Sequence, residues 1–164
     1  MQLTYPTTMV QGFAGMLADN NPRNDILSRA SEEATSFPYG VALVRGTDLE
    51  TQVKLPTAAA AILGIAVHTH ANEVGSDGLN KIDLDDAVNV LHEGRIYVIP
   101  EETVAVGDPV YVRIATGAGG TQKGAFRNDA DTATALLASG MRWIQGGTST
   151  TVAILEIDAG AAIA

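Results

Sequence analysis

The segment Val104-Ala105-Val106-Gly107-Asp108-Pro109-Val110-Tyr111-Val112-Arg113-Ile114 gives the clearest structural signal in this sequence. Its Gly-Asp-Pro triplet is typical of a tight turn. After the turn, Val110, Val112 and Ile114 fall on one face of an extended chain, because alternate residues of a strand point the same way. Tyr111 and Arg113 fall on the other face. The segment therefore predicts a turn followed by a strand with one apolar face.

Similar short apolar runs occur on both sides of this segment, separated by turns rich in Gly, Pro and Asp. They lie at residues 40–44, 61–70, 87–91, 95–99, 141–144 and 151–157. Residues 87–91 and 95–99 are predicted to form a hairpin with Gly94 near its turn. Strands at such intervals are typical of small barrels and sandwiches. The sequence predicts an all-β fold, a small β-barrel or β-sandwich, with an extended N-terminal arm.

Composition and charge narrow the function classes. The chain has 164 residues, and an apolar fraction of 46% excludes an intrinsically disordered protein. Ten Lys and Arg face nineteen Asp and Glu, for a formal charge of −9. Proteins that bind nucleic acid or anionic membranes gather basic residues, so neither partner is expected. Cysteine is absent, which excludes disulfides and thiolate chemistry.

No membrane-spanning segment or signal peptide is expected from the sequence. The longest apolar stretch, residues 58–67, is too short to cross a bilayer. The first basic residue is Arg23, so the positively charged start of a signal peptide is missing. The sequence predicts a soluble protein made in a cytoplasm.

Residues 1–35 differ from the rest and are predicted to form the arm, with residues 36–164 as the core domain. Single apolar residues are spread through this segment without a strand or helix period. It is either a poorly ordered terminus or an arm that buries its apolar residues on a neighbouring protein. The second interpretation is favoured. It assigns contacts with a neighbouring protein or a second subunit to Tyr5, Met9, Phe13, Met16 and Leu17.

Few residues suggest chemistry. His68 and His70 share one face of a predicted strand, and a third metal ligand would come from His92, Asp83, Asp85 or Asp86. Histidines near the end of a strand are more often surface residues, so no metal, cofactor or catalytic residue is predicted. The glycine-rich residues 117–124 lack the pattern of a P-loop and indicate a surface loop. Trp143 is expected to anchor the core or a subunit interface.

Seven short motifs follow one another along the chain. They are Gly12-Phe13-Ala14-Gly15-Met16-Leu17-Ala18-Asp19, Phe37-Pro38-Tyr39-Gly40-Val41-Ala42, Ile62-Leu63-Gly64-Ile65-Ala66-Val67, Gly94-Arg95-Ile96-Tyr97-Val98, Val106-Gly107-Asp108-Pro109-Val110-Tyr111-Val112, Ala138-Ser139-Gly140-Met141-Arg142-Trp143 and Thr151-Val152-Ala153-Ile154-Leu155-Glu156-Ile157. In this order they resemble the head decoration, or structural cement, proteins of tailed bacteriophages.

The resemblance implies a virion protein without catalytic activity, whose β-barrel or β-sandwich has a tulip-like form. Such proteins sit on the outer capsid surface, bridge neighbouring major capsid subunits and stabilise the shell against the pressure of packaged DNA. It further implies synthesis in the host bacterial cytoplasm. A homo-trimer around three-fold positions is expected because closed symmetry matches such positions, and a dimer is the alternative. Rival functions are a tail or baseplate component, a metal-dependent enzyme around His68 and His70, and a sugar- or peptide-binding module around Trp143.

Overall fold

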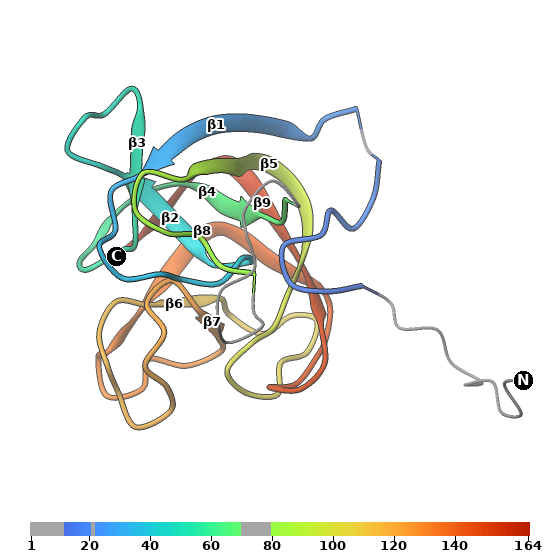
Figure 1. The fold of residues 1–164 in the computed structure, drawn as a ribbon. Helices are drawn as coiled ribbons and strands as arrows, with labels where there is room; N and C mark the ends of the chain where they lie inside the picture. The colour runs from blue at the N-terminus through green and yellow to red at the C-terminus, as the bar shows by residue number, and fades with distance from the viewer. Residues whose placement is uncertain (1–11, 21, 70–79) are drawn as a thin grey trace, which may run out of the picture.

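The computed structural model describes residues 12–20, 22–69 and 80–164, and this part of the chain forms one sheet of nine strands (Figure 1). The strands are β1 (Asp25–Ser31), β2 (Ala42–Arg45), β3 (Gln52–Lys54), β4 (Ala60–Val67), β5 (Ala87–Val98), β6 (Tyr111–Arg113), β7 (Phe126–Arg127), β8 (Ala135–Gln145) and β9 (Ala153–Ile163). Their order is β1-β3-β2-β4-β5-β9-β8-β6-β7. The all-β prediction is confirmed.

Five of the strands form a closed ring, as in a small β-barrel. β1 pairs with β3 at one edge and with β5 at the other, and β2 and β4 complete the circuit. The β1–β5 pairing is antiparallel and extends from Asp25 to Ala30. Figure 1 shows β1 beside β5 across the top of the molecule. Because the ring is closed, each of these five strands has a hydrogen-bonded neighbour on both sides.

β5 links the ring to the rest of the sheet. Its first half pairs with β1 and β4, and its second half, from Gly94 to Val98, pairs with β9. The predicted hairpin at this place is wrong, because the chain continues in one direction through twelve residues. Gly94 has a φ of 137°, a backbone conformation that favours glycine. At Gly94 the strand therefore changes its pairing partners, from β1 and β4 to β9, without reversing its direction.

Two apolar cores lie on opposite faces of the shared strands. On β2, Leu43 packs inside the ring and its neighbour Ala42 packs on the other side. On β4, Leu63 faces the ring core while Ile65 faces the second core. β2 and β4 are thus covered on both faces, which explains their continuous apolar sequences.

The second core lies between the ring and the pairs β8–β9 and β6–β7. Val110 and Val112 are buried in it, as their alternation predicted. Trp143 also lies there, 2% exposed, with its indole N–H donating to the Pro109 carbonyl at 3.3 Å. The structure thus places Trp143 in the core, and the contact with the capsid or a second subunit that was also predicted for it stays a prediction.

β1 was not predicted, because its segment, residues 25–31, mixes apolar and polar residues without a clear period. Its place in the ring comes from pairing with β5 and from Leu27, which packs against the ring core. The division into an arm at 1–35 and a core at 36–164 stays a prediction, although β1 belongs to the sheet. In the described ranges, no helix is long and apolar enough to cross a membrane.

Candidate docking surface

Residues 12–20, which we call the docked segment, lie along the second half of β5. The Gly15 amide donates to the Tyr97 carbonyl at 2.8 Å, and the Tyr97 amide donates to the Met16 carbonyl at 2.8 Å. The Ala18 amide donates to the Arg95 carbonyl at 3.0 Å. The docked segment thus continues the sheet beyond β5 with three backbone hydrogen bonds, each of which contributes about 1 kcal/mol.

Gly15 lets the docked segment approach the core closely. Its φ is 84°, and a Cβ at this position would lie 2.7 Å from the Cβ of Tyr39. The Gly15 carbonyl accepts a hydrogen bond from the His68 amide at 2.8 Å. The imidazole of His68 lies between the rings of Phe13 and Tyr39, with both centroid distances at 4.7 Å. The segment is therefore held by backbone pairing and by aromatic contact.

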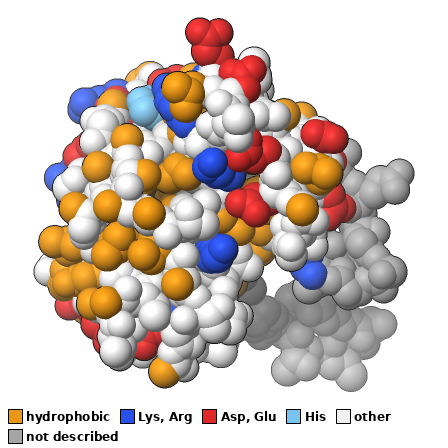
Figure 2. Space-filling view, turned by 90° about the vertical axis from the view of Figure 1, so that its left-hand side faces the viewer, with side chains coloured by type: hydrophobic (Ala, Val, Ile, Leu, Met, Phe, Trp, Pro, Cys, Tyr) orange, Lys and Arg blue, Asp and Glu red, His pale blue; other side chains and the backbone are white. Residues whose placement is uncertain are grey.

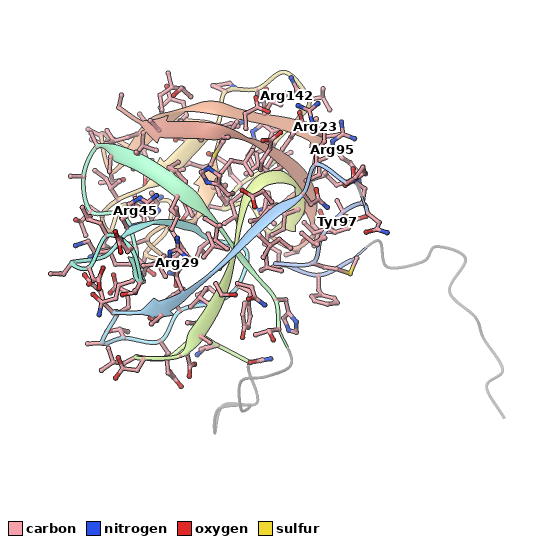
Figure 3. The ribbon with its side chains drawn as sticks, turned by 90° about the horizontal axis from the view of Figure 1, so that it is seen from above. Arg23, Arg29, Arg45, Arg95, Tyr97 and Arg142 are labelled. Atoms are coloured by element: carbon pink, nitrogen blue, oxygen red, sulfur yellow. The ribbon has the colours of Figure 1, made fainter. Side chains whose placement is uncertain are left out.

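Ion pairs join the next residues of the chain to the same strands. Asp19 pairs with Arg95 at 3.5 Å, and Arg23 pairs with Glu93 at 3.4 Å. Figure 3 shows Arg23 and Arg95 close together, with Arg142 beside them. Arg23 is well exposed and the other three side chains are partly exposed, so each pair contributes at most about 1 kcal/mol. Their effect is to fix the path of the chain between the docked segment and β1.

Glu156 lies at the centre of this arginine group. It accepts from Arg95 Nε at 2.6 Å and is also paired with Arg142. Burial alone would raise the pKa of the Glu156 carboxyl, but the hydrogen bond from Arg95 and the charge of Arg142 lower it below its usual value. The carboxylate therefore stays charged and joins β5, β8 and β9 at one point.

An apolar hollow of about 290 Å³ opens beside the docked segment, and we call it the arm-side hollow. It is lined by Ala14, residues 38–41, residues 99–101, Gln122, Ala125 and Ser149. Two large apolar side chains near it are exposed: Phe13 by 46% and Ile99 by 47%. Such exposed groups beside a concave apolar surface are typical of a protein interaction site.

Two buried arginines position one wall of this hollow, the long loop of residues 114–134 between β6 and β8, which contains the two-residue strand β7. Arg113 is fully buried, and its Nε donates to the two Glu101 carboxylate oxygens at 2.6 and 2.8 Å. Its other nitrogens donate to Asp131 at 2.8 Å and to Thr134 at 3.0 Å. The pKa of the Arg113 guanidinium is raised, chiefly by the hydrogen bond with Glu101.

Arg127, the second buried arginine, also pairs with Glu101 and contacts further carboxylates. It contacts Glu101 at 3.1 Å, Glu102 at 3.1 Å and Asp129 at 2.6 Å. The Arg113 hydrogen bond and the Gly119 amide hold the pKa of Asp131 down, to about 2. Buried charges are stable only when they are paired in this way. The sequence predicts a surface loop here but gives no sign of these ion pairs, because they join residues far apart along the chain.

A second apolar surface lies on the side of the C-terminus, where Figure 2 shows apolar side chains gathered on one face. Here β4, β9 and β8 lie in register, with Ala61 opposite Ala162 and Ala162 opposite Ser139. Ala61 is exposed, and Leu137 is 47% exposed.

The predicted contact residues have different positions. Phe13 is exposed beside the arm-side hollow, whereas Met16 and Leu17 are half-buried, and Leu17 packs against the second core. Tyr5 and Met9 lie outside the described residues. Trp143 is buried in the second core, so its side chain does not reach the surface of the single chain.

The histidines considered for a metal site are not brought together in the described part of the chain. His68 lies in the aromatic contact with Phe13 and Tyr39, and His92 Nδ1 is 2.6 Å from the Leu63 carbonyl. His70 falls outside the described residues. Among the residues that the structure places, no three His, Asp or Glu side chains are grouped so that they could hold a metal ion.

Comparison with known proteins places this architecture among phage capsid components. A solved structure titled "The capsid of Myoviridae Phage XM1" includes a chain similar to this one, with a TM-score of 0.69 and 16% sequence identity, covering 98% of both chains. At this identity the likeness shows a shared fold. No curated protein sequence matches. The family model described as structural cement protein (E217 gp24/Pam3 gp6) matches residues 1–158. Because the match spans nearly the whole sequence, the chain belongs to this family of phage structural cement proteins.

Proposed function

We propose that this cement protein sits on the outer surface of the phage head, bridges neighbouring major capsid subunits and stabilises the shell against the pressure of packaged DNA. The observation that carries the proposal is the arm-side hollow next to the exposed Phe13 and Ile99. A surface with exposed aromatic and aliphatic anchors around a concavity suits docking on another protein. The docked segment holds Phe13 in place before binding, which lowers the entropy cost of association.

A cement protein acts through many weak contacts that symmetry repeats, so its single-site affinity can be modest. We infer a homo-trimer at three-fold positions, since closed cyclic symmetry matches those positions, with a dimer as the alternative. Family membership supports synthesis in the host bacterial cytoplasm together with the other capsid proteins.

The test is co-sedimentation of purified protein with expanded capsid shells. Three chains are compared: the full chain, a chain beginning at Gly12, and the full chain with Phe13→Ala. A chain beginning at residue 36 is unsuitable, because it lacks β1 and opens the five-strand ring. Leu84→Ala is the matched control, because Leu84 is also about half exposed and lies away from the hollow.

Saturable binding by the full chain, weakened by Phe13→Ala and unchanged by Leu84→Ala, supports the proposal. A tenfold loss of affinity is expected for Phe13→Ala, equivalent to about 1.4 kcal/mol. Binding that is unaffected by Phe13→Ala assigns the contact to another face. Absence of binding by the full chain to the shells of its own phage contradicts the outer-surface proposal.

A further inference from the structure

We propose that the arm-side hollow receives an uncharged, apolar segment of the major capsid subunit, with an aromatic or aliphatic side chain of that segment seated against Val41, Ile99 and Ala125. The inference rests on the proposed cement function and names the chemistry of the partner at this site. Three features of the molecule support it: the charge of the hollow's lining, the position of the exposed apolar anchors and the rigidity of both walls.

The lining of the hollow offers no unpaired charge. Glu101 has the one charged side chain among the described residues that line it. Its carboxylate oxygens accept hydrogen bonds from Arg113 and Arg127, and a Cβ at Gly120 would overlap one of them, so the backbone of the long loop covers this carboxylate as well. A charged side chain entering the hollow would lose hydration without gaining a partner of opposite charge, whereas an apolar side chain gains by leaving water.

A second hollow of similar size gives the contrast. It has a volume of about 310 Å³ and lies beside Gly94. Three arginines, which Figure 3 shows together, and three carboxylates line it: Arg23, Arg95, Arg142, Glu93, Glu156 and Asp158. The exposed apolar anchors are found at the neutral hollow, where Ile99 belongs to the lining and Phe13 adjoins it at Ala14. A charged partner segment would find matching groups at the arginine-lined hollow, so the neutral hollow with its apolar anchors fits an apolar segment.

Both walls of the hollow are fixed before a partner binds. On one side, the docked segment is hydrogen-bonded to β5 through Gly15 and Met16. On the other side, the Gly124 carbonyl accepts from the Ala42 amide at 2.8 Å, and a Cβ at Gly124 would lie 2.6 Å from the Ala42 carbonyl oxygen, so the long loop is pressed against β2. A preformed hollow loses little conformational entropy when a segment enters it. Its volume of about 290 Å³ is at the lower end for binding pockets and suits one or two side chains.

The described part of a second copy fits the hollow less well. Three of its exposed apolar side chains adjoin carboxylates in the sequence: Ile26 follows Asp25, Leu49 lies between Asp48 and Glu50, and Leu84 lies between Asp83 and Asp85. Inserting any of these side chains would bring a carboxylate to a lining that has no free cation. The net charge of −9 also opposes contact between copies. The capsid subunit is therefore the occupant to which we assign the hollow.

The test is co-sedimentation of full chains, changed at the half-buried lining residue Gln122, with expanded shells of the protein's own phage. Gln122→Met keeps the size of the side chain without a charge, Gln122→Glu is isosteric and negative, and Gln122→Lys is positive. The methionine variant should bind as tightly as the unchanged chain. Both charged variants should bind at least about tenfold more weakly, because each brings an unpartnered charge into the contact. Gln52→Glu is the matched control and should bind unchanged, since Gln52 is also half-buried but lies on β3, away from the lining.

Opposite effects of the two charges would overturn the proposal: tight binding by Gln122→Lys alone indicates an acidic occupant, and tight binding by Gln122→Glu alone a basic one. Ser149→Trp, which adds a large side chain to the lining, should also weaken shell binding, whereas the neighbouring Thr150→Trp should not.

The remaining outcomes separate this inference from the cement function. Shell binding that is weakened by Phe13→Ala but by no change at Gln122 or Ser149 leaves the cement function standing and rejects the hollow as the place of contact. Absence of shell binding by the unchanged chain rejects both. In sedimentation velocity without shells, self-association that Ser149→Trp abolishes would assign the hollow to a second copy and overturn the proposal.

Discussion

Gly15 shows how a single residue controls the docked segment. Alanine at this position must adopt a φ of 84° and place its Cβ 2.7 Å from Tyr39. The left-handed backbone alone costs roughly 1–2 kcal/mol for a residue with a side chain, and the clash adds to it. We expect Gly15→Ala to lower the free energy of unfolding and to speed hydrogen exchange at the Tyr97 amide, which donates to Met16.

Gly107 supplies the control for Gly15. Its φ is 95°, but a Cβ there would meet no atom within 4 Å. Gly107→Ala thus carries the backbone cost of about 1–2 kcal/mol without the clash. Urea denaturation should show the larger loss for Gly15→Ala, and only this variant should change exchange at Tyr97. Equal losses of unfolding free energy in the two variants would mean that the docked segment shifts away from Tyr39 and relieves the clash without losing stability.

Among the elements, the loop of residues 114–134 depends on charge for its position. Asp131 has a folded pKa of about 2 against 3.8 for the free side chain. Its ion pairs therefore stabilise the fold fully above about pH 4, and this contribution is lost as the pH falls through 2. We expect the free energy of unfolding to fall between about pH 5 and pH 2, and Asp131→Asn to make this fall shallower while lowering stability at pH 5.

The comparison for Asp131→Asn is Asp25→Asn, which changes an exposed carboxylate on β1 outside the arginine network. Unfolding followed by tryptophan fluorescence reports on the right region, because Trp143 packs against Phe126 of β7 with a centroid distance of 6.5 Å. If the free energy of unfolding of Asp131→Asn falls with pH as steeply as that of the unchanged protein, other carboxylates cause the acid sensitivity.

The same elements show what sequence reasoning can find. Val110 and Val112 were placed correctly because burial on one face of a strand leaves an alternating pattern. β1 was missed, because a strand that closes a ring gains its stability from partners far along the chain, here β5 and β3. At β5, a glycine between two apolar runs has the same local pattern whether the chain reverses or bends, and only the pairing with β9 decides between them. Buried ion pairs such as Arg113 with Glu101 leave no periodic pattern at all.

For the whole molecule, the net charge of −9 opposes the close approach of copies in the proposed oligomer. Raising the salt concentration from about 0.05 M to 0.5 M shortens the screening length from above 10 Å to below 8 Å, which weakens this repulsion. Apolar contacts, such as those predicted between Tyr5 or Met9 of the arm and a second subunit, are not weakened by salt. Self-association of the full chain should therefore strengthen with salt in sedimentation velocity at fixed protein concentration, while a chain beginning at Gly12 stays monomeric throughout. Dissociation of the full chain at high salt would instead assign the contact to ion pairs between copies, for which the exposed Arg142 would be the first residue to change.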